Sequence, residues 1–303
     1  MGSNTVHLLV VDAYRGGHPT PTHSSKSVLR LAENLTRTGS LSKSGEQSLV
    51  DAVARGKKDA RNQGCDDLLA FATSAVRDAS NSAAVLARVQ RETGVELAVL
   101  SGAEEARLTF LAVRRWYGWS AGRLLALDIG GGSLEMAVGV DEEPELAISV
   151  PLGAGRMARE FLRGDPPDKK GLTALREHAE TVLAKPAKNI AEVGPLDRIV
   201  ATSKTFRSLA RLTGAARSSA GPRVTRHLTL DGLGQLIGFI SRISSADLAE
   251  LDGVSGTRAH QLLAGAVVAE VTMRMLGLGA VQICPWALRE GVILRRLDWL
   301  EGV

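Results

Sequence analysis

The strongest candidate for a catalytic or binding site lies in residues 124–135, where an apolar run leads to an acidic residue and then to a glycine-rich turn. Asp128 precedes the turn and Glu135 follows it. The turn contains Gly130, Gly131, Gly132 and Ser133. Consecutive backbone N–H groups in such a turn form a concave anion site, to which a serine hydroxyl adds a donor. The two carboxylates can hold a hard cation such as Mg²⁺ or Mn²⁺ beside it. The alternative is a glycine-rich hairpin with ordinary surface acids.

A second candidate lies at residues 101–107, where Glu104 and Glu105 fall in the first turn of a predicted helix. Acids at a helix N-terminus complement the macrodipole, so capping alone explains one of them. Adjacent helical residues point about 100° apart, so only one of the two can face a given cleft. A glutamate that faces a bound phosphate can orient and deprotonate water.

Two copies of the tripeptide Ala-Thr-Ser, at residues 72–74 and 201–203, mark places where a strand passes into a helix. Arg77 follows the first copy and Lys204 the second. Helix N-termini bind phosphate through free N–H groups, and a basic side chain adds charge-assisted hydrogen bonds. The turn at residues 152–156 can donate further N–H groups. For Arg77, a surface contact with the acid that follows it is the competing interpretation.

The elements that must position these residues alternate between strands and helices, which indicates an α/β fold. Strands are predicted at 6–13, 68–72, 97–100, 123–128, 134–140, 147–155 (with a turn) and 198–201. Helices are predicted at 42–63, 82–93, 103–115, 157–162, 171–184, from 204, 231–243, 257–276 and 286–297. Residues 2–5 and their strand match residues 130–133 and theirs, and Ala-Thr-Ser recurs in the same order. These echoes predict two related halves that face one another across a cleft.

Composition narrows the class of protein further. The 303 residues suffice for two domains, and no apolar stretch approaches the ~20 residues of a membrane span. The two cysteines lie far apart in the sequence, which fits a reducing cytoplasm and excludes a disulfide framework. Residues 1–150 hold 16 basic and 18 acidic side chains, and residues 151–303 hold 21 and 15. A positive second half can attract a phosphate-rich small molecule, whereas 4% aromatic residues argue against nucleic acid as a partner.

Several catalytic motifs are missing from the sequence. No Gly-Lys-Ser/Thr follows the glycine turn, so the turn is not a P-loop, and no GxGxxG spacing occurs. Neither an HExxH pair, a Gly-x-Ser-x-Gly elbow nor a Cys-x-x-Cys pair occurs. The remaining candidates all concern phosphate.

Taken together, these segments resemble the Ppx/GppA phosphatase family, the exopolyphosphatases and guanosine pentaphosphate phosphohydrolases of the acetate kinase/Hsp70/actin superfamily. The resemblance covers nearly the whole chain in family order. It rests on GSNTVHLLVVD, ATSAVRDASN, SGAEEARLTFLAV, LLALDIGGGSLEMAVG, VPLGAGR, ATSKTFRSLARL and WALREGVIL. It implies an α/β fold of two ribonuclease-H-like domains, 1–118 and 119–303, with an active site in the cleft between them. The helix near 286–297 is expected to pack back on the first domain.

The resemblance also assigns roles to individual residues. Glu105 matches the family's catalytic glutamate, and Asp128 and Glu135 match its metal-associated acids. The phosphate-binding positions are Ser3, Asn4, Arg77 and the glycine turn, with Lys204 added from its place after the second Ala-Thr-Ser. The implied activity is Mg²⁺-dependent hydrolysis of terminal phosphoanhydride bonds.

The sequence departs from the family pattern at both ends. Longer members carry a C-terminal helical domain that resembles HD phosphohydrolases, and this sequence is similar to the short form without it. Family members begin with a strand that ends in Asp-x-Gly-Ser-Asn, and here Met1 occupies the x position. The internal repeat agrees, because it places the counterpart of Asp128 just before Met1. We therefore expect an additional strand ending in Asp in the natural protein.

We expect an exopolyphosphatase that removes orthophosphate from the end of inorganic polyphosphate. Hydrolysis of guanosine pentaphosphate is the nearest alternative. A non-catalytic polyphosphate or nucleotide sensor is favoured if the first strand is truly missing, although the retained acids argue against it. A sugar or acetate kinase is disfavoured because no acceptor motif is apparent. The expected location is the cytoplasm, without membrane contact, and the superfamily allows a homodimer.

Overall fold

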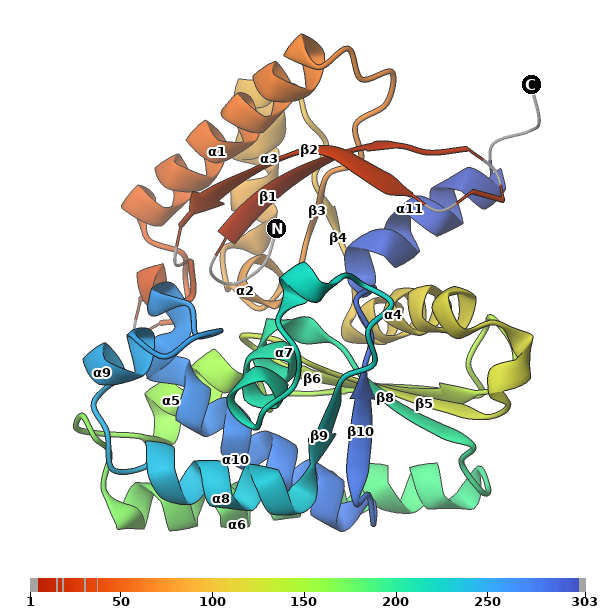
Figure 1. Cartoon of the computed structure of the whole chain (residues 1–303). Coiled ribbons are helices and arrows are strands. Elements are labelled where there is room, and N and C mark those ends of the chain that lie inside the picture. The colour runs from red at the N-terminus through yellow and green to blue at the C-terminus, as the bar shows by residue number, and fades with distance from the viewer. Residues whose placement is uncertain (1–4, 15, 18, 30, 37, 300–303) are drawn as a thin grey trace. The chain divides into compact units, whose positions relative to one another are not determined.

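The computed structural model describes residues 5–299 except 15, 18, 30 and 37, and its elements divide into two compact units. The first unit draws on residues 1–105 and 292–303, and the second on residues 106–291. The predicted boundaries at 1–118 and 119–303 and the predicted cleft stay predictions. Helices and strands alternate along the chain (Figure 1), which confirms the α/β class. Within the described part of the chain, no helix is long and apolar enough to cross a membrane.

The first unit is built on two pairs of strands. Its elements are β1 (Thr5–Asp12), β2 (Thr20–Val28), η1 (Leu31–Asn34), α1 (Lys43–Asn62), β3 (Phe71–Ala72), α2 (Ser74–Arg77), α3 (Ser82–Thr93) and β4 (Ala98–Val99). β1 and β2 are antiparallel, whereas β3 and β4 are parallel. The apolar faces of α1 and α3 supply Leu49, Val53, Val85 and Val89 to one buried cluster. This core supports the short helix α2, which carries Arg77.

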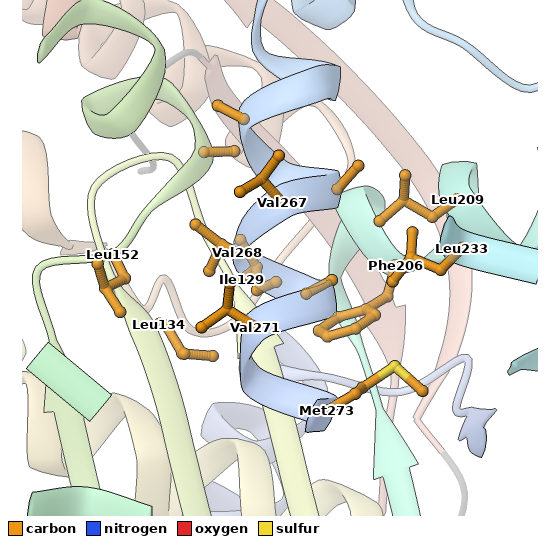
Figure 2. Packing of buried hydrophobic residues seen from close by; sticks show 14 of the residues in the cluster. Ile129, Leu134, Leu152, Phe206, Leu209, Leu233, Val267, Val268, Val271 and Met273 are labelled. Atoms are coloured by element: carbon orange, nitrogen blue, oxygen red, sulfur yellow. The ribbon is translucent and has the colours of Figure 1, made fainter. Parts of the chain in front are cut away.

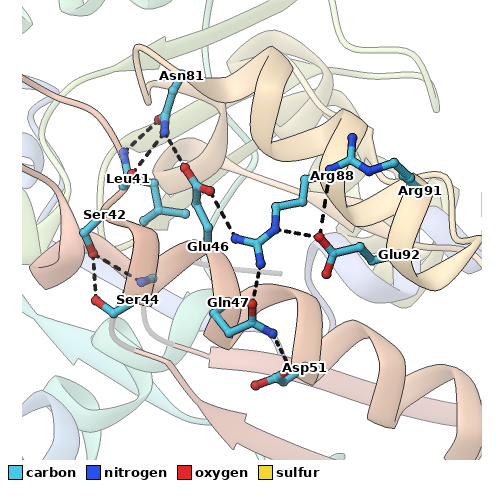
Figure 3. Close-up of polar contacts among 11 residues, drawn as sticks. Leu41, Ser42, Ser44, Glu46, Gln47, Asp51, Asn81, Arg88, Arg91 and Glu92 are labelled. Carbon is cyan, nitrogen blue, oxygen red and sulfur yellow. Dashed lines mark hydrogen bonds and ion pairs between the residues drawn. The ribbon is translucent and has the colours of Figure 1, made fainter.

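A polar network fixes the stretch that follows α2 (Figure 3). The Asn81 side chain accepts from the Leu41 N–H at 2.8 Å and donates to the Leu41 carbonyl at 3.0 Å. It also donates to Glu46 at 2.9 Å, and Glu46 in turn accepts from Arg88 at 3.3 Å. Asn81, the residue before α3, therefore bonds both backbone groups of Leu41 and ties the start of α3 to the start of α1.

The second unit contains one six-stranded sheet in the order β7-β6-β5-β8-β10-β9. Its strands are β5 (Leu124–Ile129), β6 (Leu134–Gly139), β7 (Leu146–Val150), β8 (Arg198–Ala201), β9 (His227–Thr229) and β10 (Ala280–Ile283). Its helices are η2 (Trp119–Ala121), α5 (Ala154–Phe161), α6 (Lys169–Glu192), α7 (Ser203–Leu212), η3 (Ser218–Ala220), α8 (Leu230–Ile240), α9 (Ser245–Ala249), η4 (Gly256–Arg258) and α10 (Ala259–Met275). Helices α4 (Gly102–Tyr117) and α11 (Leu288–Trp299) each have residues in both units.

Helix α10 is the centre of the second unit's core (Figure 2). It is apolar on nearly every side, as expected for a helix that is buried all round. Figure 2 shows Val267, Val268 and Val271 between Leu134 and Leu152 on one side and Phe206 and Leu209 on the other. The core thus joins the strand that follows the glycine turn to helices α7 and α10.

The two faces of the sheet are covered by different helices. Leu125 and Leu127 of β5 belong to the core around α10, whereas Leu124 and Ala126 pack with Phe110 of α4. Successive side chains of a strand point to opposite faces. Asp128 therefore lies on the α4 face of the sheet, at the end of β5.

The strand pairing supports the predicted internal repeat. In the second unit the antiparallel pair β6–β7 and the parallel pair β8–β10 flank β5. The first unit has the matching pairs β1–β2 and β3–β4, but its described residues supply no counterpart of β5. The threonines that follow β3 and β8 share a backbone conformation, with φ −119° and ψ −157° at Thr73 and φ −116° and ψ −155° at Thr202. The additional strand expected before Met1 stays a prediction.

Cys284 directly follows β10 and is 1% exposed. Its N–H donates to the carbonyl of Ala201 at 2.9 Å, which extends the ladder between β10 and β8. Burial raises the pKa of the Cys284 thiol to about 12. The folded chain therefore keeps this thiol protonated far above the pH at which an unfolded cysteine ionises.

We expect this burial to make the free energy of unfolding fall with rising pH. An unfolded cysteine ionises at about pH 8.5, so the Cys284 contribution is complete below that pH and is lost as pH rises towards the folded pKa of about 12. From about pH 7 to about pH 10 the loss is about 2 kcal/mol. Urea unfolding of the wild type and of Cys284→Ala at both pH values measures this loss, as the difference between the two proteins in how their free energy of unfolding changes with pH. Equal slopes for the two proteins contradict the assignment.

Candidate active site

Helix α4 gives its two adjacent glutamates different environments. Glu104 accepts from the Ser101 N–H at 2.7 Å, and its own N–H donates to the Ser101 hydroxyl at 3.2 Å. This reciprocal pair is a capping box, so capping accounts for Glu104. Glu105 is 7% exposed, and its backbone N–H makes the first helical hydrogen bond, to the Ser101 carbonyl at 2.9 Å. The structure thus separates a capping acid from a buried one.

The buried Glu105 side chain forms an ion pair with Arg77 within the first unit. Arg77 also donates to the Leu100 carbonyl at 3.0 Å and to the Asp78 carboxylate at 3.1 Å. Burial alone would lower the pKa of Arg77, but the nearby Glu105 and Asp78 carboxylates raise it above its usual value. The contact with the neighbouring acid Asp78 is therefore present, and Arg77 also pairs with the candidate base Glu105. The binding of phosphate by Arg77 stays a prediction.

The glycine turn joins β5 to β6 as a tight hairpin loop. The Gly130 N–H donates to the Ser133 carbonyl at 2.9 Å, which closes the turn. None of the described residues accepts a hydrogen bond from the N–H groups of Gly131, Gly132 or Ser133. Three consecutive donors without a protein acceptor are what an anion site requires.

The start of helix α5 supports this turn from behind. The N–H groups of Ala154 and Arg156 donate to the carbonyls of Gly130 and Gly131, each at 2.9 Å. These two N–H groups of the 152–156 turn therefore bond within the protein and are not available to phosphate. A Cβ on Gly153 would lie 2.3 Å from backbone atoms of Gly132 and Ser133. The φ of Gly153, −73°, is open to any residue. The close approach of the turn, and not the backbone conformation, is therefore what requires glycine at this position.

Asp128 and Glu135 are directly paired across the hairpin. They are Cα partners in the antiparallel β5–β6 register, so their side chains lie on the same face of the sheet. Asp128 accepts a hydrogen bond from the Thr202 hydroxyl, and Glu135 accepts one from Ser149 at 2.9 Å. The hairpin therefore places two carboxylates side by side next to the three free N–H groups.

This pair of carboxylates fits a site for a hard divalent cation such as Mg²⁺ better than a zinc site that is built from three or four protein ligands. No three His, Cys, Asp or Glu side chains gather as a metal-binding group anywhere in the described ranges. Mg²⁺ does not need such a cage, because it keeps several waters and binds through one or two carboxylates and the phosphates of a substrate. Asp128 and Glu135 have the right chemistry for that mode of binding, and their role as metal-associated acids stays a prediction.

Two arginines lie close enough to Asp128 to influence its charge. Burial raises the pKa of Asp128, while the Thr202 hydrogen bond and the charges of Arg207 and Arg258 act in the opposite direction. Burial also lowers the pKa of both arginines, and Arg258 is lowered further by repulsion from Arg207. A bound polyanion would relieve this repulsion. No motif in the sequence points to Arg258, and only the positive charge of residues 151–303 hints at such a residue.

The remaining predicted phosphate residues lie in different places. Lys204 is largely exposed, and its ammonium lies 3.5 Å from the Gly253 carbonyl, at a small cavity that Arg258 and Gln261 also line. Ser3 and Asn4 lie outside the described residues. Within the second unit the structure thus groups Asp128, Glu135 and the glycine turn. Within the first it groups Arg77 and Glu105. The roles of all these residues stay predictions.

Comparison with known proteins places these features in one family. The family model of the Ppx/GppA phosphatase family matches residues 10–299. Exopolyphosphatase 1 of Mycobacterium tuberculosis is 62% identical over 298 residues, which cover 98% of this chain and 87% of that protein. A crystal structure of an exopolyphosphatase from Cytophaga hutchinsonii superposes with a TM-score of 0.88 at 24% identity, over 99% of this chain and 97% of that one. The likeness to that structure confirms the fold.

A more distant relative carries the alternative activity in its name. The guanosine-5'-triphosphate,3'-diphosphate pyrophosphatase of Aeromonas hydrophila is 26% identical over 294 residues. These residues cover 97% of this chain but 57% of that protein.

Proposed function

Because the chain belongs to the Ppx/GppA phosphatase family, we propose that it is an exopolyphosphatase that releases terminal orthophosphate from inorganic polyphosphate. The observation that carries the proposal is 62% identity, over 98% of the chain, to a protein named Exopolyphosphatase 1. The candidate site supports it independently, since three N–H groups that have no acceptor among the described residues lie beside two carboxylates. A phosphate site with a place for a divalent cation is what hydrolysis of a phosphoanhydride needs.

The glycine turn has the task of holding the terminal phosphate. Its three N–H groups and the Ser133 hydroxyl can donate to phosphate oxygens without breaking a hydrogen bond to any residue that the structure describes. Arg77 would contribute a second, charged contact to phosphate, from a side chain that Asp78 and Leu100 hold in place. Phosphoryl transfer needs positioning and charge stabilisation more than covalent chemistry, so rigidly held donors are the main requirement.

Glu105 would align the attacking water and accept its proton. Its burial and its ion pair with Arg77 hold the carboxylate in one position at the start of a helix. The arrangement couples the group that binds phosphate to the group that activates water. A base fixed in this way lowers the barrier by orientation as well as by proton transfer.

Asp128 and Glu135 would hold Mg²⁺, with Mn²⁺ as a substitute. When bound there, the ion would neutralise negative charge on the transferring phosphoryl group. Arg207 and Arg258 add positive charge near Asp128, which favours a substrate with many phosphates. A polyphosphate chain meets this condition. Guanosine pentaphosphate is the second candidate, favoured by the relative from Aeromonas hydrophila.

We place the reaction in the cytoplasm, because both cysteines are free thiols and Cys284 is buried without a partner cysteine. Neither nucleic acid nor a membrane is expected as a partner, and a homodimer remains part of the proposal.

The products of the reaction test this proposal. Polyphosphate of defined length is incubated with the chain and Mg²⁺, and ³¹P NMR follows orthophosphate, terminal phosphates and internal phosphates. We expect orthophosphate to rise while the number of chain ends stays constant, and chelation by EDTA to stop the reaction until Mg²⁺ or Mn²⁺ is restored. A rising number of chain ends would indicate internal cleavage. Activity that persists in EDTA would show that the reaction needs no metal ion. Either result contradicts the proposal.

A further inference from the structure

Thr202 lies beside Asp128 at the ends of two neighbouring parallel strands. Leu127 of β5 and Ala201 of β8 are register partners, so Asp128 and Thr202 follow them at the same edge of the sheet. The Thr202 N–H donates to the Leu127 carbonyl at 2.8 Å and extends the ladder by one residue. The backbone of Thr202 is thereby fixed relative to β5.

The Thr202 hydroxyl is committed to the carboxylate of Asp128. Its side chain is fully buried, so water cannot satisfy the hydroxyl. The hydroxyl has a single proton to donate, and its distance to the competing Leu127 carbonyl, 3.5 Å, is far longer than its contact with Asp128 Oδ2. Among the described residues this is the single hydrogen bond to the Asp128 side chain, so Oδ1 receives none.

Ser203, which follows Thr202, has a strained backbone conformation. Ser203 has a φ of 69°, and it is the one non-glycine residue in the described part of the chain with positive φ. Such a conformation is strained for serine and persists where surrounding contacts enforce it. The Ser203 hydroxyl accepts from the Phe206 N–H at 3.3 Å, and its carbonyl accepts from Arg207 at 3.0 Å. These contacts turn the chain directly from β8 into α7 while Thr202 stays against β5.

From these contacts we infer that Thr202 is a positioning residue for the divalent cation of the reaction. Its hydroxyl donates a hydrogen bond to Oδ2 of Asp128 and so fixes the rotation of the carboxylate. Oδ1 is then left to bind the cation. The inference rests on the proposed function only in so far as Asp128 holds that cation. Groups that orient a metal ligand without touching the metal change metal affinity by about 10- to 100-fold when removed.

The test measures metal binding directly, with Mn²⁺ as the probe. Free Mn²⁺ is counted by electron paramagnetic resonance in titrations of the wild type, Thr202→Val and Thr202→Ser. We expect Thr202→Val to weaken Mn²⁺ binding by about 10-fold or more. Thr202→Ser keeps the hydroxyl and should restore binding to within about threefold of the wild type, which a purely structural role for the methyl group would not do.

Thr272→Val is the matched control. Thr272 is equally buried in the same unit, but its hydroxyl donates at 2.7 Å to the Val268 carbonyl within helix α10. This variant should lose a buried hydroxyl and keep wild-type affinity for Mn²⁺. The inference is overturned if folded Thr202→Val binds Mn²⁺ like the wild type, if Thr202→Ser fails to restore binding, or if the wild type binds no Mn²⁺. A wild type that binds Mn²⁺ but releases no orthophosphate from polyphosphate contradicts the proposed function alone.

Discussion

Replacement of Glu105 by glutamine is expected to slow orthophosphate release from polyphosphate by at least ~100-fold, the usual scale for loss of a general base. Glutamine keeps the size of the side chain and an oxygen that can accept from Arg77. It loses the negative charge and the ability to take a proton from water. Binding of polyphosphate in the presence of Mg²⁺ should therefore persist, because the glycine turn and Arg77 are untouched. Steady-state release and equilibrium binding on the same preparation measure the two effects separately.

The adjacent residue provides the control for this result. Glu104→Gln makes the same chemical change in the same helical turn, and glutamine is accepted in a capping box. Since Glu104 contacts the Ser101 N–H, its replacement should leave turnover within about twofold of the wild type. Near-normal turnover in Glu105→Gln would remove Glu105 from the role of base. Equal losses in both variants would point to the helix terminus instead.

The second large effect is expected from Gly153→Ala, although residue 153 needs no contact with substrate. An alanine Cβ would lie 2.3 Å from three backbone atoms of the glycine turn, against 3.4 Å for ordinary contact, so the turn must move by about 1 Å. Misplacement on this scale at a reacting centre costs about 100-fold. We therefore expect kcat/KM for polyphosphate to fall by about 100-fold, while circular dichroism reports a folded protein.

Gly234→Ala tests whether any added methyl in this unit has the same consequence. Gly234 lies in α8, and a Cβ there meets no atom within 4 Å. Alanine is the better helix former, so this variant should keep full activity and gain up to about 1 kcal/mol in stability. If Gly153→Ala is as active as Gly234→Ala, the proposed phosphate-binding role of the turn has no support.

Much of the fold follows from local pattern, and the exceptions have physical causes. The apolar runs and turns of β1, β5 and β6 are predicted within one or two residues. Strand β2 escapes prediction because its sequence, TPTHSSKSV, has no apolar alternation and pairs through its backbone. Strand β10 is a four-residue run whose partner β8 lies far away in the sequence. The sequence pattern predicts that helix α6 ends at residue 184, but the helix continues to Glu192, through the buried Pro186.

The residues of the candidate site likewise include some that local sequence pattern predicts and some that it does not. Sequence pattern identifies the glycine turn and its flanking acids, because they fall within one hairpin. It also limits the choice between Glu104 and Glu105, but only the capping box with Ser101 decides which of them is buried. The hydrogen bond from Thr202 to Asp128 and the electrostatic influence of Arg258 on Asp128 depend on long-range packing of strands and helices. Local reasoning has no access to such pairings.

The central claim is that this chain hydrolyses polyphosphate, and the most direct test compares its substrates side by side. Orthophosphate release is measured from short and long polyphosphate and from guanosine pentaphosphate, each with Mg²⁺ and with EDTA. We expect Mg²⁺-dependent release with the highest kcat/KM on polyphosphate. A higher kcat/KM on guanosine pentaphosphate would contradict the choice of substrate. Binding of polyphosphate by folded protein without release of orthophosphate would contradict the enzyme itself and favour a sensor.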